Sequence, residues 1–373
     1  MPVYYNGEIL TMDGGEKPEA VGVQNGIVSA VGKMSEVTAA APDEERVDLA
    51  GRSLLPAFVD AHSHITALAE MACAAHKPQK GRVPTPEDWR DGLRVACAEY
   101  VRLGYGTAQE GCAGLPELGL LSAAAAAGEL PLDVIAYCGI GVADQVHRDY
   151  FMHWKHYRGR FKIGGYKLFL DGEPRDGSAW TKDGGKSRHT DTEVEEAFRR
   201  AAADRAQLAV HCNGEAACEQ MIAACLRLKS AGVPLYRPVM LHAQLLRPEQ
   251  LPRVAEAGII PSFFISAIPV FGDDLLKTLG ERAQELCPAG SAAALGIPFT
   301  LHQDTPVLPP DPRMAADAAV KRETAAGAVL GEGQRITREQ ALAALTANAA
   351  YQCFEENTKG KLKPGFSGDI VIL

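Results

Sequence analysis

The sequence predicts an α/β protein whose centre is a (β/α)8 TIM barrel, with a small β unit formed by the two ends of the chain. Eight short apolar runs alternate with stretches of helical periodicity through the middle of the chain. Strands that alternate with helices indicate a parallel sheet, and eight repeats in about 250 residues match a closed barrel. An open, doubly wound sheet is the alternative fold, but its glycine-rich phosphate-binding turn after the first strand is missing here.

Both ends of the chain show strand patterns without long helices. Residues 20–32 run largely apolar around Asn25-Gly26, which is a strong signal for a two-residue hairpin turn. Residues 370–373 are a β-branched stretch typical of a strand. The expected domains are a small β domain of residues 1–53 and 355–373, and a barrel of residues 54–354.

The eight candidate strands of the barrel are short apolar runs. They are residues 54–60, 107–111, 132–139, 165–171, 207–212, 238–243, 259–265 and 298–303. The stretches between them carry helix-start signals. These signals are Thr85 followed by Pro86, and the capping-box pairs Thr192 with Glu195 and Thr337 with Gln340. The polar segments 141–160 and 172–190 are expected to be active-site loops.

Composition and charge restrict the partners. With 46% hydrophobic and 23% charged residues, the composition is that of an ordinary globular protein. A net charge of −9 without a basic cluster argues against nucleic acid and anionic membranes, so a small-molecule substrate is expected, and a homo-oligomer stays open. No apolar stretch is long enough to span a bilayer, and the N-terminus lacks a secretory pattern. The nine scattered cysteines include no Cys-x-x-Cys pair, which favours reduced, buried thiols in the cytoplasm.

The first candidate strand ends in two histidines one residue apart, His62 and His64. Residues i and i+2 of a strand point to the same face, so the two imidazoles project together. Asp60 is close enough in the chain to orient one of them. Such a pair also occurs without any ligand, so the other strand ends decide between the two interpretations.

Four further candidate strands end in, or contain, a group that can bind a metal ion. These groups are Lys167, His211, His242 and Asp304. The C-terminal ends of the strands form the active-site face of a barrel. The ordered set therefore indicates a metal site more strongly than any single histidine.

Lys167 is a lone charged side chain inside an apolar strand. One interpretation is a buried ion pair with an inward carboxylate such as Glu110. The other is that burial lowers the pKa of the amine. The neutral amine can then add carbon dioxide to give a carbamate, an oxygen-donor anion that can bridge two metal ions.

The chain resembles the amidohydrolase superfamily over nearly its whole length. Within that superfamily it is most similar to the YtcJ-like branch, which includes N-substituted formamide deformylases. The motifs that carry the resemblance are residues 57–64, 167–172, 211–216, 241–245, 304–307 and 346–350. The resemblance implies a metallohydrolase barrel beside a small β-sandwich made of both termini.

The resemblance also implies a role for each metal-binding group. His62, His64 and Asp304 would hold the more buried ion, His211 and His242 the more exposed one, and carbamylated Lys167 would bridge them together with a hydroxide. Imidazole and carboxylate ligands suit zinc, and two ions about 3.5–4 Å apart are a recurring hydrolytic arrangement. A single ion is the simpler alternative. Asp304 would also transfer the proton during hydrolysis.

The expected function is a metal-dependent amidohydrolase that hydrolyses a C–N bond of a small molecule, in an amide, a formamide or a cyclic amide, with a metal-bound hydroxide. A mononuclear zinc aminohydrolase, or deaminase, on the same barrel is one alternative. The spacing from His211 to Glu215 and the lysine on the fourth strand disfavour it. A non-catalytic barrel protein that serves in assembly is the other, and it predicts missing ligands, whereas none is missing.

The substrate pocket departs from the branch at several positions. Asp304, at the end of the eighth strand, follows His302-Gln303, and His242, at the end of the sixth strand, follows Leu241. The substrate is therefore not carried over from the resemblance. Candidate substrate contacts, chosen by their place near strand ends, are His302, Gln244, Tyr105 and Trp180. Loop cations that can meet a carboxylate, but are more commonly solvated, are Arg158, Arg160, Arg175 and Lys182.

Overall fold

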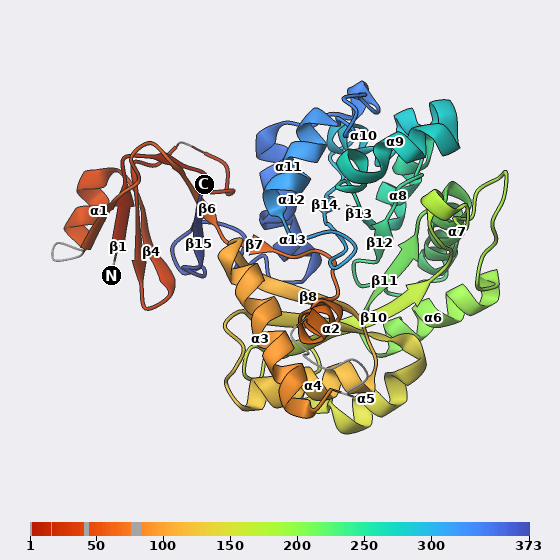
Figure 1. Ribbon diagram of the computed structural model, residues 1–373, viewed down its shortest axis with the longest axis horizontal. Coiled ribbons are helices and arrows are strands. Elements are labelled where there is room, and N and C mark those ends of the chain that lie inside the picture. The colour runs from red at the N-terminus through yellow and green to blue at the C-terminus, as the bar shows by residue number, and fades with distance from the viewer. Residues whose placement is uncertain (1, 16, 41–44, 76–83) are drawn as a thin grey trace.

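A curled, eight-stranded parallel sheet forms the larger part of the molecule, and helices pack around its outside (Figure 1). The structure, a computed structural model, describes residues 2–15, 17–40, 45–75 and 84–373. The strands of the sheet follow one another in chain order: β7 (Phe58–Val59), β8 (Tyr105–Ala113), β9 (Asp133–Gly139), β10 (Phe161–Phe169), β11 (Gln207–Cys212), β12 (Val239–His242), β13 (Ile260–Phe263) and β14 (Thr300–Leu301). This is the parallel α/β architecture that the alternating pattern predicts.

The sheet has two short edge strands, β7 and β14, of two residues each. No strand pairing joins them within the part of the chain that the structure describes. The backbone N–H of His64 instead donates to the carbonyl of Thr305 at 2.6 Å, which links the segments that follow the two edge strands. Loop contacts therefore bring the ends of the sheet together next to the candidate site.

Most of the helices cover the outer face of the sheet, whereas α13 (Ala347–Gln352) packs on the inner face. Those that follow the strands of the sheet are α2 (Ile65–Ala75), α3 (Pro86–Arg102), α4 (Leu115–Ala126), α5 (Ala143–Asp149), α6 (Asp191–Ala203), α7 (Glu215–Ser230), α8 (Leu251–Ala257), α9 (Ala267–Leu279), α10 (Ala289–Ala294), α11 (Pro312–Lys321), α12 (Arg338–Leu345) and α13 (Ala347–Gln352). The predicted helix starts at Thr85 and Thr337 are confirmed, each with a capping box.

Both chain ends contribute to a small sheet beside the curled one (Figure 1). In it, β15 (Ile370–Ile372) runs antiparallel to β6 (Ser53–Pro56), which runs parallel to β2 (Glu8–Ile9). A second small sheet has the order β4 (Ile27–Gly32), β3 (Ala20–Gln24), β1 (Pro2–Tyr5) and β5 (Glu45–Asp48), with α1 (Met34–Ala40) packed on it. Asn25 and Gly26, with φ of 50° and 74°, form the predicted hairpin turn between β3 and β4. The division of the chain into two domains stays a prediction.

Three sequence predictions need correction. The run 54–60 is not one strand, because β6 joins the small sheet and only β7 joins the curled sheet. The capping box of α6 is Thr190 with Glu193, not Thr192 with Glu195. The segment 141–160 is not all loop, since it contains α5.

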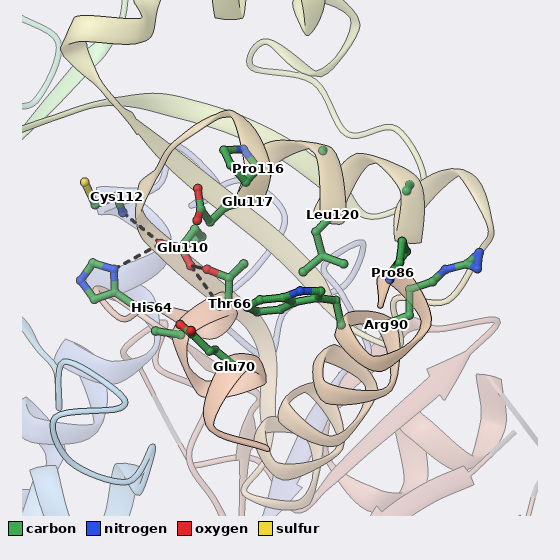
Figure 2. Close-up of a pocket in the computed structure, with 14 residues that line it drawn as sticks. His64, Thr66, Glu70, Pro86, Arg90, Glu110, Cys112, Pro116, Glu117 and Leu120 are labelled. Carbon is green, nitrogen blue, oxygen red and sulfur yellow. Dashed lines mark hydrogen bonds and ion pairs between the residues drawn. The ribbon is translucent and has the colours of Figure 1, made fainter. Parts of the chain in front are cut away.

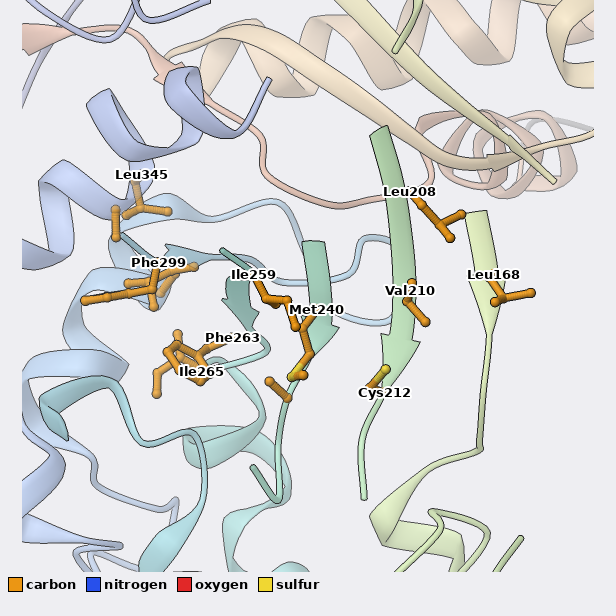
Figure 3. Close-up of a cluster of buried hydrophobic side chains, with 14 of the residues drawn as sticks. Leu168, Leu208, Val210, Cys212, Met240, Ile259, Phe263, Ile265, Phe299 and Leu345 are labelled. Atoms are coloured by element: carbon orange, nitrogen blue, oxygen red, sulfur yellow. The ribbon is translucent and has the colours of Figure 1, made fainter. Parts of the chain in front are cut away.

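The strands are buried on both faces, which is why they read as nearly continuous apolar runs. The outer face packs against the helices through a large cluster that includes Val210, Met240 and Phe263 (Figure 3). A smaller cluster lies on the other face, where Ile135, Ala209 and Leu241 are among the strand residues that meet Ala349 and Ala350 of α13. The chain therefore fills the concave side of the sheet with apolar residues, large ones such as Ile135 and Leu241 together with the alanines of α13.

None of the helices that the structure describes is both long and apolar enough to cross a membrane. All nine cysteines are free thiols, and each except Cys112 is buried.

Candidate metal centre

The six predicted metal ligands lie at the C-terminal ends of five strands. His62 and His64 follow β7, and Asp304 follows β14. Lys167 lies near the end of β10 beside Ala209 of β11, a residue of the inner cluster, so its side chain faces the concave side of the sheet. His211 is the second-last residue of β11, and His242 is the last residue of β12.

The side chains converge around Asp304 and His62. Nε2 of His62 is 3.3 Å from Oδ1 of Asp304 and 3.1 Å from Nζ of Lys167. Nε2 of His64 is 3.6 Å from the same carboxylate oxygen, and Nδ1 of His242 is 3.9 Å from the other. The ring of His211 lies 4.4 Å from that of His242, centre to centre. The structure thus brings all six predicted residues together, and one possible ligand atom from each of His62, His242 and Asp304 lies within 4.8 Å of the others.

Most of the site is buried, and burial keeps the imidazoles of His62, His211 and His242 neutral. It lowers the pKa of His211 to about 3, and it lowers the pKa values of His62 and His242 well below their usual range. Burial also lowers the pKa of Lys167 to about 8. Neutral imidazole is the form of histidine that binds a metal. The uncharged amine is the form of lysine that reacts with carbon dioxide, and a pKa of about 8 makes that form more abundant near neutral pH.

The donor set fits a divalent cation. Oδ1 of Asp304 is buried and accepts no hydrogen bond from the described residues, although Nε2 atoms of two histidines face it. A buried carboxylate oxygen without a hydrogen-bond partner is costly unless a cation pairs with it. The backbone is also strained at two of the ligands, with φ of 71° at His242 and 56° at Asp304. Strain of this kind is concentrated at functional sites.

Glu110 holds His64 rather than Lys167. Its carboxylate lies 3.2 Å from Nδ1 of His64 and accepts hydrogen bonds from the amide of Thr66 at 3.0 Å and the amide of Cys112 at 3.1 Å. Burial alone would raise the pKa of Glu110, but the hydrogen bond and charge of His64 bring it below its usual value. The alternative in which Lys167 pairs with Glu110 is therefore not what the structure shows, because the nearest polar partner of Lys167 is His62.

Asp60 orients the backbone of the turn and not an imidazole ring. Its carboxylate accepts the amide of His62 at 3.2 Å and the amide of Gln109 at 3.2 Å, and also the hydroxyl of Ser63. Asp60 therefore fixes the backbone that carries both histidines. The sequence-based expectation was a direct contact with one of the imidazole rings.

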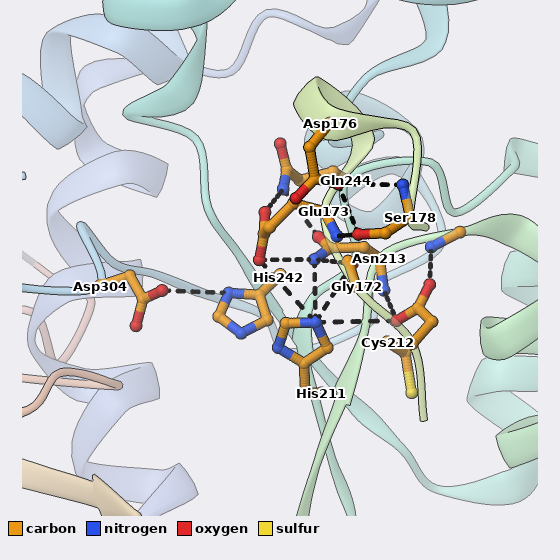
Figure 4. Close-up of polar contacts among 12 residues, drawn as sticks. Gly172, Glu173, Asp176, Ser178, His211, Cys212, Asn213, His242, Gln244 and Asp304 are labelled. Carbon is orange, nitrogen blue, oxygen red and sulfur yellow. Dashed lines mark hydrogen bonds and ion pairs between the residues drawn. The ribbon is translucent and has the colours of Figure 1, made fainter. Parts of the chain in front are cut away.

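Two acidic residues without a predicted role stand next to His211 (Figure 4). Asp171 accepts backbone hydrogen bonds from Asn213 at 2.9 Å, Gly214 at 2.7 Å and Trp180 at 2.9 Å, and so ties the loop after β10 to the end of β11. Glu173 lies 3.8 Å from Nε2 of His211, and burial raises its pKa to about 7. In the sequence, the signal for these two acids is Asp171, which ends the predicted strand 165–171.

The four candidate substrate contacts lie at different distances from the predicted metal ligands. Gln244 lines a small cavity with Asp304 and donates to Asn213 Oδ1 at 2.7 Å. His302 is fully buried, and its Nε2 lies 3.2 Å from Nδ1 of His242, so it contacts a predicted ligand. Tyr105 begins β8, at the opposite end of the strand from the site, and is buried against Phe58. Trp180 lies partly buried in the loop after β10.

The four loop cations also lie in different places. Arg175 lines the small cavity beside Asp304. Arg158 and Arg160 precede β10 and lie at the opposite end of the sheet, where Arg160 pairs with Asp133 at 3.0 Å. Lys182 lies in the loop after β10, where its amide donates to Glu215.

Comparison with known proteins identifies the family of the chain. A model of the Amidohydrolase family matches residues 75–373, and the chain belongs to that family. It is 25% identical over 227 residues to YtcJ of Bacillus subtilis (strain 168), which is assigned as an amidohydrolase; the match covers 57% of this chain and 42% of the relative. It is 39% identical over 66 residues to an N-substituted formamide deformylase of Arthrobacter pascens, over 17% of this chain and 12% of that protein. The matches thus span less than half the length of these curated relatives.

Solved structures share the fold over the whole chain. An uncharacterised metal-dependent hydrolase from Pyrococcus horikoshii has a TM-score of 0.85 at 20% identity, covering 100% of this chain and 97% of that one. A zinc-bound adenosine deaminase from Xanthomonas campestris has a TM-score of 0.67 at 17% identity, covering 100% of this chain and 84% of that one. At these identities the likeness defines the fold, and the chemistry has to be argued from the residues of this chain.

Proposed function

We propose that the protein is a metal-dependent hydrolase that cleaves a C–N bond of a small molecule, in an amide, a formamide or a cyclic amide. The observation that carries the proposal is the convergence of neutral imidazoles, Lys167 and the unpartnered oxygen of Asp304 at the C-terminal ends of the strands. Membership of the Amidohydrolase family supports it. Imidazole and carboxylate donors favour zinc.

Each residue then has a defined part in binding the metal. His62, His64 and Asp304 would hold one ion, and His211 and His242 a second, with carbamylated Lys167 between them. A divalent ion supplies two things when bound, a lowered pKa of water and polarisation of the substrate carbonyl. Glu110 keeps the ring of His64 turned so that its Nε2 faces Asp304.

Asp304 is the proton carrier in this proposal. One of its oxygens faces the imidazoles, and the carboxylate also lines the small cavity next to Gln244. It can accept a proton from the attacking water and return it to the leaving nitrogen, which leaves poorly unless it is protonated. General acid–base help of this kind is worth about 10²–10⁴-fold in rate.

The test combines metal analysis with one substitution. Elemental analysis of protein supplied with zinc and bicarbonate is expected to find up to two ions per chain, and a panel of N-acyl, formyl and cyclic amides is expected to contain a substrate. Asp304→Asn is expected to keep much of the metal and to lower kcat by about 10²–10⁴-fold. Protein that binds no divalent metal, or a variant that keeps its metal and most of its kcat, would contradict the proposal.

The deaminase alternative is disfavoured by the two ion pairs of Glu215. Glu215, the acid nearest to His211 along α7, is buried at the start of that helix and pairs with Arg282 at 2.9 Å and Arg247 at 3.4 Å. Its carboxylate is engaged in ion pairs. An amino-substituted heterocycle in the assay panel tests this alternative directly, because ammonia is then the product.

A further inference from the structure

Two of the predicted metal ligands have one ring nitrogen engaged by a hydrogen-bond acceptor. Nδ1 of His64 lies 3.2 Å from Glu110, at one end of a cavity between α2, α3 and α4 (Figure 2). Nε2 of His211 lies 3.3 Å from the carbonyl oxygen of Gly172. A ring nitrogen that donates its proton to an acceptor leaves the other nitrogen with a free electron pair, and metal-binding histidines are held in this way.

His242 contacts a second histidine instead of a carboxylate or a carbonyl. Its Nδ1 lies 3.2 Å from Nε2 of His302, and Nδ1 of His302 lies 2.9 Å from the hydroxyl oxygen of Ser262 in β13. All three residues are buried, and the ring of His302 stacks on Phe264 with 5.7 Å between the ring centres. A buried chain of three polar side chains therefore ends at a predicted metal ligand.

Protons can be donated along this chain in only two directions. Burial lowers the pKa values of His242 and His302 well below their usual range, so each ring is neutral and carries one N–H. In one direction Ser262 donates to His302, which donates to Nδ1 of His242. In the other direction Nδ1 of His242 donates to His302, which donates to Ser262.

The carboxylate of Asp304 favours the second direction. Its Oδ2 lies 3.9 Å from Nδ1 of His242, and a negative charge at this distance stabilises an N–H and repels an electron pair. With the proton on Nδ1, Nε2 of His242 keeps a free electron pair. In the first direction Nδ1 would accept a hydrogen bond and Nε2 would carry the proton, so neither nitrogen would be free for a metal.

We propose that His302 is a positioning residue, which together with Ser262 keeps the proton of His242 on Nδ1 and so leaves Nε2 for a metal ion. The inference rests on the proposed function for the ion itself, but the proton position can be measured without one. His302 then has no polar atom left for the substrate, because both of its ring nitrogens are used inside the protein.

The first test determines which nitrogen of His242 carries the proton. Long-range ¹H–¹⁵N correlation spectra of full-length protein with ¹⁵N-labelled histidine distinguish the two tautomers of a neutral imidazole, and His242→Asn identifies the signals of His242. The Nδ1–H tautomer is expected before and after zinc is added. The Nε2–H tautomer in the wild type overturns the proposal, and this measurement does not depend on whether any variant folds.

The second test measures zinc affinity in competition with a chelator. His302→Leu removes the acceptor and is expected to weaken zinc binding by about 10–100-fold. His302→Gln keeps a side-chain oxygen that can accept from Nδ1 of His242, and it is expected to recover most of this loss. Ser262→Ala removes the far end of the chain and is expected to cause a smaller loss than His302→Leu.

Ser266→Ala is the matched control for Ser262→Ala. Ser266 is also a fully buried serine, but its hydroxyl has no hydrogen-bond partner among the residues that the structure describes. Its zinc affinity is expected to equal that of the wild type.

The outcomes separate this proposal from the proposed function. Equal zinc affinities for the wild type and His302→Leu overturn the role of His302 and leave the hydrolase proposal intact. A loss as large in His302→Gln as in His302→Leu, with unfolding free energies in urea like that of the wild type, also overturns it, because a hydrogen bond is then not what His302 supplies. Wild-type protein that holds His242 in the Nδ1–H form but binds no zinc supports the assigned hydrogen-bond chain and contradicts the proposed function.

Discussion

At the scale of single residues, the candidate site depends on side chains that hold other side chains. Glu110 binds no predicted metal position itself, but it contacts Nδ1 of His64 and the amide of Thr66. A carboxylate in this position fixes the tautomer and the orientation of the ring, and its loss typically lowers metal affinity about 10–100-fold. We therefore expect a residue outside the predicted ligand set to control part of the metal affinity.

We expect Glu110→Gln to weaken zinc binding by about 10–100-fold in a competition with a chelator. Glu117→Gln is the matched control. Glu117 lines the same cavity as Glu110, but its carboxylate accepts a hydrogen bond from the amide of Gly114 and not from a histidine. Equal zinc affinities for the wild type and Glu110→Gln would show that His64 needs no such support.

In the proposed site, Lys167 is the residue expected to decide whether one ion is held or two. It is buried at 2% exposure on β10, next to β11, which carries His211, and burial lowers its pKa to about 8. We expect Lys167→Ala to lose the second ion, and acetate or propionate to restore part of it by supplying the missing carboxylate. Metal stoichiometry with and without the added acid measures this. A variant that still binds two ions without any added acid would exclude a bridging role.

At the scale of single elements, the start of α6 offers a test of how the chain selects a helix cap. Both Thr190 and Thr192 precede a glutamate by three residues, and only the first pair forms the capping box. Thr190 accepts the amide of Glu193, whereas Thr192 is an exposed residue inside the first turn. We expect Thr190→Ala to lower the free energy of unfolding in urea by about 1 kcal/mol, and Thr192→Ala to change it little. The reverse order would restore the sequence-based assignment.

The elements of the sheet were predictable because each strand is buried on both faces and therefore reads as an apolar run. The predicted ligands were predictable for the same reason, since a polar residue that ends such a run stands at the active-site face. Contacts across the site were not. The partner of Glu110 and the direction of Asp60 depend on where β7 and β8 meet, and periodicity carries no information about that. Tyr105 precedes the predicted strand 107–111, so the chain direction alone places it at the N-terminal end of that strand, away from the active-site face, and the sequence was sufficient to exclude it.

At the scale of the whole molecule, a buried ion-pair network joins the C-terminal segment to the start of two strands. Glu355 lies 2.5 Å from Nζ of Lys162 in β10 and 2.7 Å from Nζ of Lys359. Lys359 also pairs at 2.5 Å with Asp133, the first residue of β9. The network therefore fixes the segment that follows α13 against the end of the sheet opposite the site.

Glu355 makes this connection sensitive to pH. Burial alone would raise its pKa, but the charges of Lys359 and Lys162 bring it below its usual value of 4.5. A carboxyl whose pKa is depressed by folding contributes stability that is fully present above the unfolded pKa and is lost as pH falls through the folded value. The contribution of Glu355 is thus constant near neutrality, begins to fall below about pH 4.3, where the carboxyl of the unfolded chain takes up a proton, and is lost as the pH falls through the lower pKa of the folded state.

We expect Glu355→Gln to destabilise the protein by about 3–5 kcal/mol at pH 7, because it leaves two buried lysines without their shared partner. The difference in unfolding free energy between the variant and the wild type should shrink as the pH falls below about 4, because the Glu355 carboxyl of the unfolded wild type then takes up a proton while that of the folded state stays charged to a lower pH. Urea unfolding at pH 7, 5 and 3.5 measures it. Glu356→Gln is the control, since Glu356 pairs with Arg237 at the partly exposed surface. A difference that stayed the same at all three pH values would mean that Glu355 stabilises the fold by packing and not by its charge.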